Sequence, residues 1–283
     1  MTLDLGDAEQ PRHVVSRDGT PIAVFSSGDG PPLILVHGTT ADHTTWRATG
    51  PELAHRYRVH AIDRRGRGAS GDGADDAGYS IELEYDDLAA VAEALAGEAE
   101  MPVDVVGHSY GGRIGLGASL RTAAIARLVV YEGAPSPAGG EGYRPNGVED
   151  RIAALIEAGD RDGALQAFFR EIVRMPEAEL DAYRANPVWP VRVAAVHTSL
   201  REIRAEGSPA ASLDALGGVA IPVLQLLGGD SAPPFGEATA ALDDRLLDGR
   251  VVVIPGARHA AHHTHVAELV AAVRAFLDDP DLT

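Results

Sequence analysis

The sequence predicts an α/β protein built around one mostly parallel, doubly wound sheet, with a helical segment inserted between two strands. Three observations lead to this fold class. The chain has 283 residues, which is enough for one large domain with an insertion. Short apolar runs alternate with helical patterns over most of its length, as in parallel sheets with crossover helices. Residues 136–211 break this alternation, because they contain helical patterns only.

A hairpin and six apolar runs account for the predicted sheet. Asp18-Gly19 is a strong turn dipeptide, so residues 13–16 and 22–25 on either side of it are predicted to pair. The other strands are predicted at residues 33–36, 59–62, 103–106, 128–131, 223–227 and 251–254. Helices between such strands give right-handed crossovers and a doubly wound sheet.

One crossover helix is marked by its own periodicity. Ser80 is a candidate N-cap, and Gly97 is expected just past the end of the helix. The apolar positions between them recur at i, i+3, i+4 and i+7: Leu88, Val91, Ala92 and Leu95. This stripe predicts a helix that packs on the sheet.

Residues 136–211 are predicted to form a helical cap, and residues 1–135 and 212–283 are predicted to form the core. The cap begins with PSPAGGEGYRPNG, which is too rich in Gly and Pro for regular structure. Apolar residues then recur at helical spacing: Ile152, Leu155, Ile156, Leu165, Phe168, Phe169 and Ile172. Enzymes build lids from insertions at strand ends, so we expect a lid over a site. The alternative is a second structural domain without contact to the site.

Composition excludes several classes of function. The chain has no cysteine, which excludes disulfides, thiolate catalysis and cysteine-ligated metals. Its net charge of −18 disfavours nucleic acid and anionic lipid as partners. No run of eighteen apolar residues could span a bilayer, and the first residues do not form a signal peptide. The predicted location is therefore the cytoplasm.

Ser109 is the candidate nucleophile. It lies in Gly107-His108-Ser109-Tyr110-Gly111, between the apolar run 103–106 and a helix-compatible stretch at 113–120. A strand, a tight turn and a helix in this order form a nucleophile elbow, in which small neighbours allow a strained serine backbone. The turn also places the hydroxyl at a helix N-terminus, where negative charge is stabilised.

With these motifs the chain resembles the α/β-hydrolase superfamily over nearly its full length. The resemblance rests on four segments, each at the end of a predicted strand: 36–39, 63–68, 107–111 and 255–259. It implies that the backbone N–H groups of Thr39 and Tyr110 form an oxyanion hole, and that the chain at Gly38 approaches the substrate closely. It also implies an active serine with a histidine base and a carboxylate.

His259 is the candidate base. It follows the predicted strand 251–254 through a Pro-Gly turn, and it completes the order serine, acid, histidine. Three further histidines follow it, His262, His263 and His265, and they are expected to be solvated. Their spacing matches no familiar ligand pattern and no carboxylate is interleaved, so no metal site is predicted.

Two carboxylates compete for the role of the acid. The usual position in the superfamily, three residues after Gly228, is Ser231 here, and Asp230 comes one residue early. A second position used in the superfamily is the end of the preceding sheet strand, where this chain has Glu132. A carboxylate at a buried strand end needs a partner such as His259, so Glu132 is favoured over Asp230.

The residues expected to contact the substrate are His37, Gly38, Trp46, Phe168 and Trp189. His37 is also expected to orient its loop, and the aromatic residues have ordinary core packing as their alternative. The arginines of DRRGRG, residues 63–68, form either a basic patch or a structural loop, and the structural loop is favoured.

The predicted function is hydrolysis of a carboxylic ester or lactone of a small apolar molecule, with no cofactor. Serine at the elbow argues against dehalogenase and epoxide hydrolase chemistry, which use a carboxylate nucleophile. Two alternatives remain: a non-hydrolytic enzyme on the same scaffold, performing cyclisation, C–C cleavage or cofactor-free oxygenation, and a ligand-binding protein on an inactive scaffold. The natural substrate and the oligomeric state do not follow from the sequence.

Overall fold

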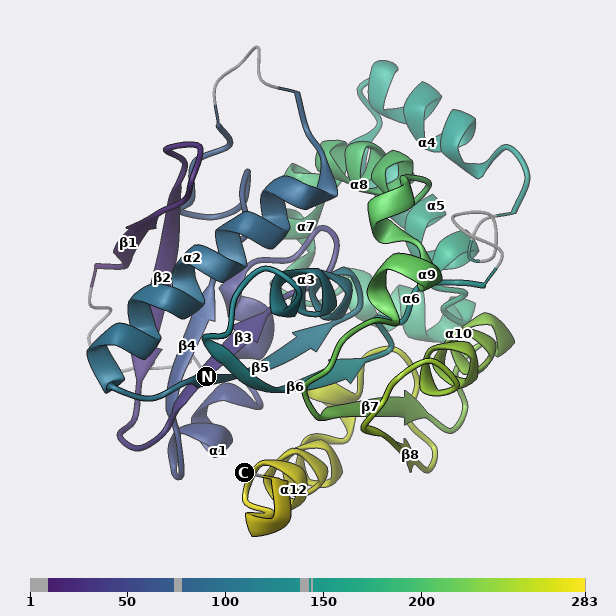
Figure 1. Ribbon diagram of the computed structural model, residues 1–283. Coiled ribbons are helices and arrows are strands. Elements are labelled where there is room, and N and C mark those ends of the chain that lie inside the picture. Colours follow the sequence, from purple (N-terminus) through teal and green to yellow (C-terminus); the bar gives the residue numbers. More distant parts are fainter. Residues whose placement is uncertain (1–9, 74–77, 138–142, 144, 283) are drawn as a thin grey trace.

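A computed structural model of the chain describes residues 10–73, 78–137, 143 and 145–282. Within these residues, one eight-stranded sheet has the order β1-β2-β4-β3-β5-β6-β7-β8 (Figure 1). Its strands are β1 (Arg12–Val15), β2 (Pro21–Ser27), β3 (Pro32–Val36), β4 (Arg58–Ile62), β5 (Val103–His108), β6 (Ile125–Tyr131), β7 (Val223–Gly228) and β8 (Gly249–Ile254). Only the pairs β1–β2 and β2–β4 are antiparallel. This confirms the predicted fold class.

The N-terminal hairpin forms at the predicted turn. Gly19 has a φ of +89°, a conformation that glycine adopts without strain. β1 and β2 pair around it in antiparallel register, with Val14 opposite Ile22. Because β2 also pairs with β4, this hairpin extends the parallel sheet by two strands at one edge.

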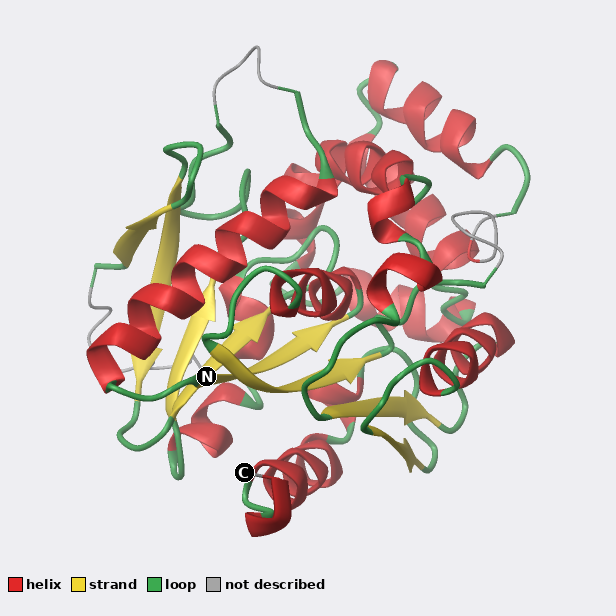
Figure 2. Ribbon diagram, in the orientation of Figure 1, coloured by secondary structure: helices red, strands yellow, loops and turns green. Residues whose placement is uncertain are grey.

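Helices cover both faces of the sheet (Figure 2). Four of them pack on one face: α2 (Ile81–Ala99), α3 (Tyr110–Ser119), α9 (Leu213–Leu216) and α10 (Pro233–Asp243). The opposite face is covered by α1 (Gly50–Ala54) and α12 (Val266–Leu277), which follows the short α11 (Ala261–Thr264). The two faces bury separate apolar clusters, because alternate strand residues point to opposite sides.

Four local details differ from the expectations. α2 continues through Gly97 and is followed by Glu100 in the left-handed region, with a φ of 54°, so packing overrides the expected glycine stop. Ser80 occupies the N-cap position but makes no side-chain capping bond. α3 begins directly after Ser109 rather than at Arg113. β8 is an edge strand whose valines are 39–50% exposed, although its apolar run resembles those of the buried strands.

The segment between β6 and β7 forms helices beyond the carboxyl ends of the strands (Figure 1). They are α4 (Val148–Glu157), α5 (Arg161–Ala167), α6 (Glu177–Arg184), α7 (Trp189–Ala195) and α8 (Ser199–Ala205), with a π-helical turn at Phe168–Ile172. These helices bury their own apolar cluster. The limits 136–211 stay a prediction, and residues 138–142 and 144 of the predicted loop lie outside the described residues.

Buried ion pairs connect these cap helices to the core. Glu202 of α8 lies between two arginines of the loop after β4: its Oε1 accepts from Arg64 Nη2 at 2.7 Å and also from Arg67 Nη2. Arg64 additionally binds Glu84 of α2 through two bonds of 2.7 Å. Arg65 binds Asp87 in the same way. The charges of these arginines are therefore neutralised within the structure. This agrees with the interpretation of DRRGRG, residues 63–68, as a structural loop.

No helix within the described ranges is long and apolar enough to cross a bilayer. Residues 1–9 of the N-terminal stretch that was examined for a signal peptide lie outside the described residues. The cytoplasmic location stays a prediction.

The buried imidazole of His60 generates a prediction about pH. His60 lies on β4, is 4% exposed, and has Nδ1 2.8 Å from Ser26 Oγ. Burial lowers its pKa to about 4. Between that value and the ordinary value near 6.5, the unfolded chain binds a proton that the folded chain does not. The free energy of unfolding therefore falls as pH falls through this window, by about 3 kcal/mol from this group.

Urea unfolding at several pH values between 7 and 4 measures this slope. We expect His60→Gln to flatten it, and His55→Gln, at an exposed position, to leave it unchanged. Equal slopes in the wild type and in His60→Gln would contradict the assignment.

The Glu202 ion pairs generate a second prediction. Glu202→Gln leaves the buried guanidinium of Arg67 without its carboxylate, so we expect the free energy of unfolding to fall by about 3 kcal/mol. Glu177→Gln is the matched control, because Glu177 forms an exposed pair with Arg170 on the same cap and should cost less than about 1 kcal/mol. Chemical denaturation compares the two, and losses of similar size would contradict the buried pairing.

Candidate active site

Ser109 lies at a strained turn between β5 and α3. Its φ of 54° and ψ of −123° place a non-glycine residue in a region that L-residues rarely adopt. The turn is held by the bond from the Ser109 N–H to the Tyr131 carbonyl of β6, at 2.8 Å. Because α3 starts at the next residue, the hydroxyl lies at the N-terminus of a ten-residue helix.

Close backbone packing explains the glycines around Ser109. A Cβ on Gly107 would lie 2.5 Å from the Gly111 carbonyl oxygen and from the Gly112 Cα. A Cβ on Gly111 would lie 2.3 Å from the carbonyl oxygen of Val36 on β3. The elbow therefore needs small residues at these positions so that strand, turn and helix can approach one another.

His259 and Glu132 are brought together from distant parts of the chain. His259 follows β8, and its Nδ1 is 2.7 Å from Glu132 Oε2. Glu132 follows β6 in a left-handed conformation, with a φ of 47°, and its side chain is fully buried. Its second oxygen, Oε1, accepts from the Gly228 N–H at 2.8 Å and from the Ser231 hydroxyl at 2.5 Å. All the contacts of this carboxylate hold it against the imidazole.

Asp230 lies apart from this pair. The residue is exposed, and its carboxylate makes no hydrogen bond or ion pair within the described residues. Its backbone instead stabilises the loop, through the bond from its N–H to the Ala257 carbonyl at 2.9 Å. Ser231, at the usual position of the acid in the superfamily, is the residue that donates to Glu132.

The loop after β3 lies against Ser109. A Cβ on Gly38 would lie 3.0 Å from Ser109 Cβ, so glycine permits the loop to approach Ser109. The close approach of Gly38 to the substrate stays a prediction. Thr40 has a φ of 61°, and its hydroxyl donates to the Thr39 carbonyl at 2.7 Å. Thr39 lines the same cavity as Ser109. The Tyr110 side chain is buried, with its hydroxyl 3.0 Å from that of Tyr79, so only its backbone is available to the site.

His37 is fully buried and orients this loop. Its Nδ1 donates to the Gly38 carbonyl at 2.8 Å, and its Nε2 accepts from the Arg64 N–H at 3.1 Å. Burial and, next, the charge of Arg64 hold the pKa of His37 well below its ordinary value. His37 is fully buried and is not among the residues that line the cavity, so its expected contact with the substrate stays a prediction.

The histidines near His259 pack against one another with tilted rings. His108 donates from Nε2 to the His259 carbonyl at 2.8 Å. The ring centroids of His108 and His262 lie 4.2 Å apart, and those of His262 and His263 lie 4.0 Å apart. The expectation that His262 is solvated was wrong: it is 1% exposed, because it packs beneath Thr45 and His108. No group of three or more potential metal ligands is found in the described part of the chain.

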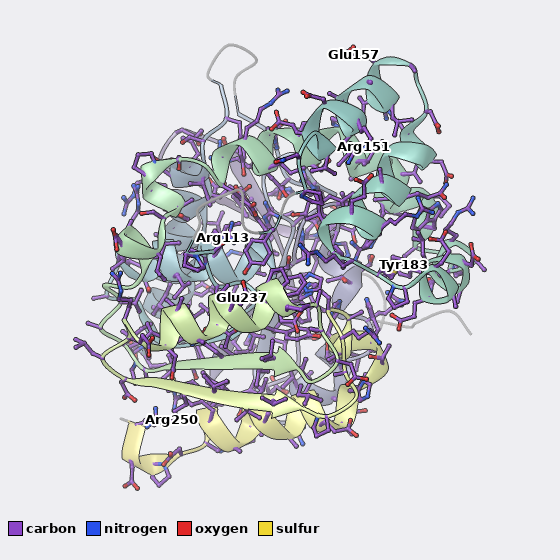
Figure 3. The ribbon with its side chains drawn as sticks, turned by 90° about the vertical axis from the view of Figure 1, so that its right-hand side faces the viewer. Arg113, Arg151, Glu157, Tyr183, Glu237 and Arg250 are labelled. Carbon is purple, nitrogen blue, oxygen red and sulfur yellow. The ribbon has the colours of Figure 1, made fainter. Side chains whose placement is uncertain are left out.

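A cavity of about 450 Å³ opens above Ser109 and His259. Tyr183, labelled in Figure 3, comes to its wall from cap helix α6. The residues that line the cavity include apolar and polar side chains: Thr39, Arg47, Ala48, His108, Ser109, Phe168, Phe169, Val173, Met175, Glu179, Ala182, Tyr183, Asn186, Arg192, His259, Ala260, His262, His263 and Thr264. A volume of this size is typical of small-molecule sites.

Of the three aromatic residues expected in the pocket, Phe168 lines the cavity and the two tryptophans do not. Trp46 is packed in the core cluster that α1 and α12 cover. Trp189 is buried in the cap, where its Nε1 donates to Asp162 Oδ1 at 2.6 Å. Sequence reasoning also missed Arg47 and Arg192, because no motif marks them and they reach the cavity only through the folding of the cap on the core.

Comparisons with known proteins agree with this fold. A family model described as "Alpha/beta hydrolase family" matches residues 33–273. An α/β hydrolase from Sphaerobacter thermophilus has a similar structure, with a TM-score of 0.77 and 30% identity over 92% of this chain and 99% of that one. The esterase RhEst1 from Rhodococcus sp. is also similar, with a TM-score of 0.76 and 25% identity over 97% and 100%.

Curated relatives include proteins of different activities. A 2-(acetamidomethylene)succinate hydrolase from Mesorhizobium japonicum is 26% identical over 271 residues, which are 90% of this chain and 91% of that protein. A probable oxidoreductase, EphD, from Mycobacterium tuberculosis is 38% identical over 106 residues, which are 36% of this chain and only 17% of that protein. The family match over residues 33–273 shows that the chain belongs to the Alpha/beta hydrolase family.

Proposed function

We propose that this protein is a serine hydrolase that cleaves a carboxylic ester or lactone of a small molecule through an acyl-enzyme intermediate. The observation that carries the proposal is the 2.7 Å bond between His259 Nδ1 and Glu132 Oε2, beside a cavity that both His259 and Ser109 line. The esterase among the structural neighbours and the hydrolase among the curated relatives support the same reaction class.

Glu132 selects the tautomer of the base. A carboxylate accepts hydrogen bonds, so His259 carries its proton on Nδ1 and leaves Nε2 free. Nε2 then takes the proton of the Ser109 hydroxyl as its oxygen attacks the acyl carbon. The bond to the leaving alcohol breaks, and His259 returns the proton to that alcohol. Water, deprotonated by His259, next attacks the acyl-enzyme and releases the acid and Ser109.

The backbone N–H groups of Thr39 and Tyr110 would hold the oxyanion in both steps. Each such donor contributes about 3 kcal/mol in enzymes where one was removed. Thr39 lies on the loop that Gly38 allows against Ser109, and Tyr110 is the first residue of α3. The positive end of this helix adds to the stabilisation of the oxyanion.

Covalent labelling tests the nucleophile. A fluorophosphonate probe should label the wild-type protein at Ser109, and Ser109→Ala should abolish both labelling and hydrolysis of short-chain 4-nitrophenyl esters. Ser119→Ala is the matched control, because it removes a hydroxyl from the other end of α3. Mass spectrometry locates the adduct.

Each negative outcome of the labelling experiment contradicts a different part of the proposal. Labelling that persists in Ser109→Ala would contradict the assignment of the nucleophile. Labelling without ester hydrolysis would favour a non-hydrolytic enzyme on this scaffold. The absence of both would favour a ligand-binding protein.

Substitution of the two carboxylates tests the acid. Glu132→Gln removes the negative charge and introduces an NH2 donor that can face His259 Nδ1 and favour the wrong tautomer, so kcat should fall by about 10⁴-fold. Asp230→Asn, on the exposed loop, should change kcat by less than about twofold. Ester kinetics on both variants, with circular dichroism to verify folding, measure the difference. Mild and equal losses would show that neither residue is the acid.

A further inference from the structure

Arg192 of cap helix α7 lies in the cavity wall without an anionic partner. The residue is 8% exposed. Its Nη1 lies 3.3 Å from the Thr39 carbonyl oxygen and 3.2 Å from Thr40 Oγ1, and its Nη2 lies 3.3 Å from Thr45 Oγ1. These acceptors are all neutral, and Arg192 forms no ion pair with any residue that the structure describes. Its positive charge is therefore buried beside the loop of the proposed oxyanion hole and is not neutralised.

A second guanidinium, that of Arg47, lines the same cavity. Its hydrogen-bond partner is again a neutral group, the Thr44 carbonyl at 3.5 Å, and it has no ion pair within the described ranges. Burial lowers the pKa of Arg47, and the charge of Arg192 acts in the same direction, whereas Tyr183 and Asp42 oppose this. Arg47 and Arg192 also line a smaller neighbouring pocket, together with Asp42, so the two guanidinium groups lie near each other.

The other ionisable groups of the wall do not neutralise this charge. Glu179 is paired with Arg258, whose Nε lies 3.1 Å from its Oε1. Burial lowers the pKa of His263 to about 3, and the charges of Arg47 and Arg192 act in the same direction. Burial and, next, the neighbouring His263 hold the pKa of His262 well below its ordinary value. The cavity wall therefore carries two guanidinium groups that form no ion pair with the described residues, in a protein whose net charge is −18.

We propose that the substrate carries a carboxylate in addition to the bond that is cleaved, and that Arg192 and Arg47 bind it. This inference rests on the proposed function. An anion in this position would neutralise one buried and one half-buried cation, and guanidinium groups bind carboxylates through charge-assisted, often bidentate, hydrogen bonds. The apolar part of the substrate would pack against Phe168, Val173 and Met175.

If Arg192 acted on the oxyanion or on the Thr39 loop and not on a substrate carboxylate, its substitution would have a different effect. Because Arg192 contacts the Thr39 carbonyl, its charge could act on the oxyanion or on the loop geometry alone. In that case the substitution of Arg192 would lower kcat/KM equally for neutral and anionic substrates. A carboxylate site instead predicts that the substitution lowers kcat/KM more for the anionic substrate.

Two esters of equal length separate these roles: mono-4-nitrophenyl glutarate and 4-nitrophenyl pentanoate, which has a methyl group in place of the carboxylate. After subtraction of enzyme-free hydrolysis, the wild-type kcat/KM should be higher for the glutarate ester. Arg192→Gln should lower this ratio by about tenfold or more, mainly through KM for the glutarate ester. Arg47→Gln should lower it less, because Arg47 is less buried. Arg192→Lys should restore part of the ratio by retaining the charge.

Arg184→Gln is the matched control. It removes the same charge from the exposed face of cap helix α6, so the ratio should stay at the wild-type value. A wild-type ratio of one or below would overturn the inference. Equal losses for the two esters in Arg192→Gln would also overturn it, while leaving the serine hydrolase intact.

Direct binding tests the inference without turnover. Calorimetry should detect glutarate binding to Ser109→Ala, and adding Arg192→Gln should weaken this binding by about tenfold or more. Absence of glutarate binding, or equal binding in both proteins, would overturn the carboxylate site. Absence of fluorophosphonate labelling would instead contradict the proposed function, so the two failures are distinguishable.

Discussion

The site depends on a buried carboxylate at the end of β6. Glu132 is fully buried, and its charge is compensated by the imidazole of His259, the Gly228 N–H and the Ser231 hydroxyl. Burying a carboxylate without such partners costs several kcal/mol, so the loops after β7 and β8 are held in the positions that satisfy it. The same strand end holds the serine turn, through the bond from the Ser109 N–H to the Tyr131 carbonyl. One strand end therefore positions both the proposed acid and the proposed nucleophile.

The electrostatics of the cavity differ from those of the whole molecule. A net charge of −18 repels anions at a distance, but salt screens exposed charges beyond about 10 Å. Inside the cavity, Arg192 and Arg47 are close to any ligand and are screened much less. Local charge therefore decides which ligand is bound, whereas net charge affects mainly how fast an anionic ligand arrives. A protein can be strongly acidic and still present a cationic binding site.

Local patterns predicted the parts of the fold and of the site that local chemistry determines. The strands, the glycines around Ser109 and the position of Glu132 at a strand end can all be recognised within short segments. The residues that sequence reasoning missed or misplaced depend on contacts between distant segments. His262 is buried because Thr45 and His108 lie over it, and Arg192 reaches the cavity because the cap folds back on the loop after β3. Hydrophobicity alone also could not separate cavity aromatics from the buried Trp46 and Trp189.

The cap is connected to the core at two places near the site, and these connections determine the shape of the cavity. Glu202 of α8 binds Arg64 and Arg67 of the loop after β4, and Arg192 of α7 binds the loop that carries Thr39. Separating the cap from the core would expose or unpair these buried charges, which is costly for any ion pair that loses one partner. The apolar wall, the two cations and the serine are therefore arranged before a substrate binds. Such preorganisation reduces the conformational entropy that is lost on binding, so a ligand gains most of its contacts from groups already in position.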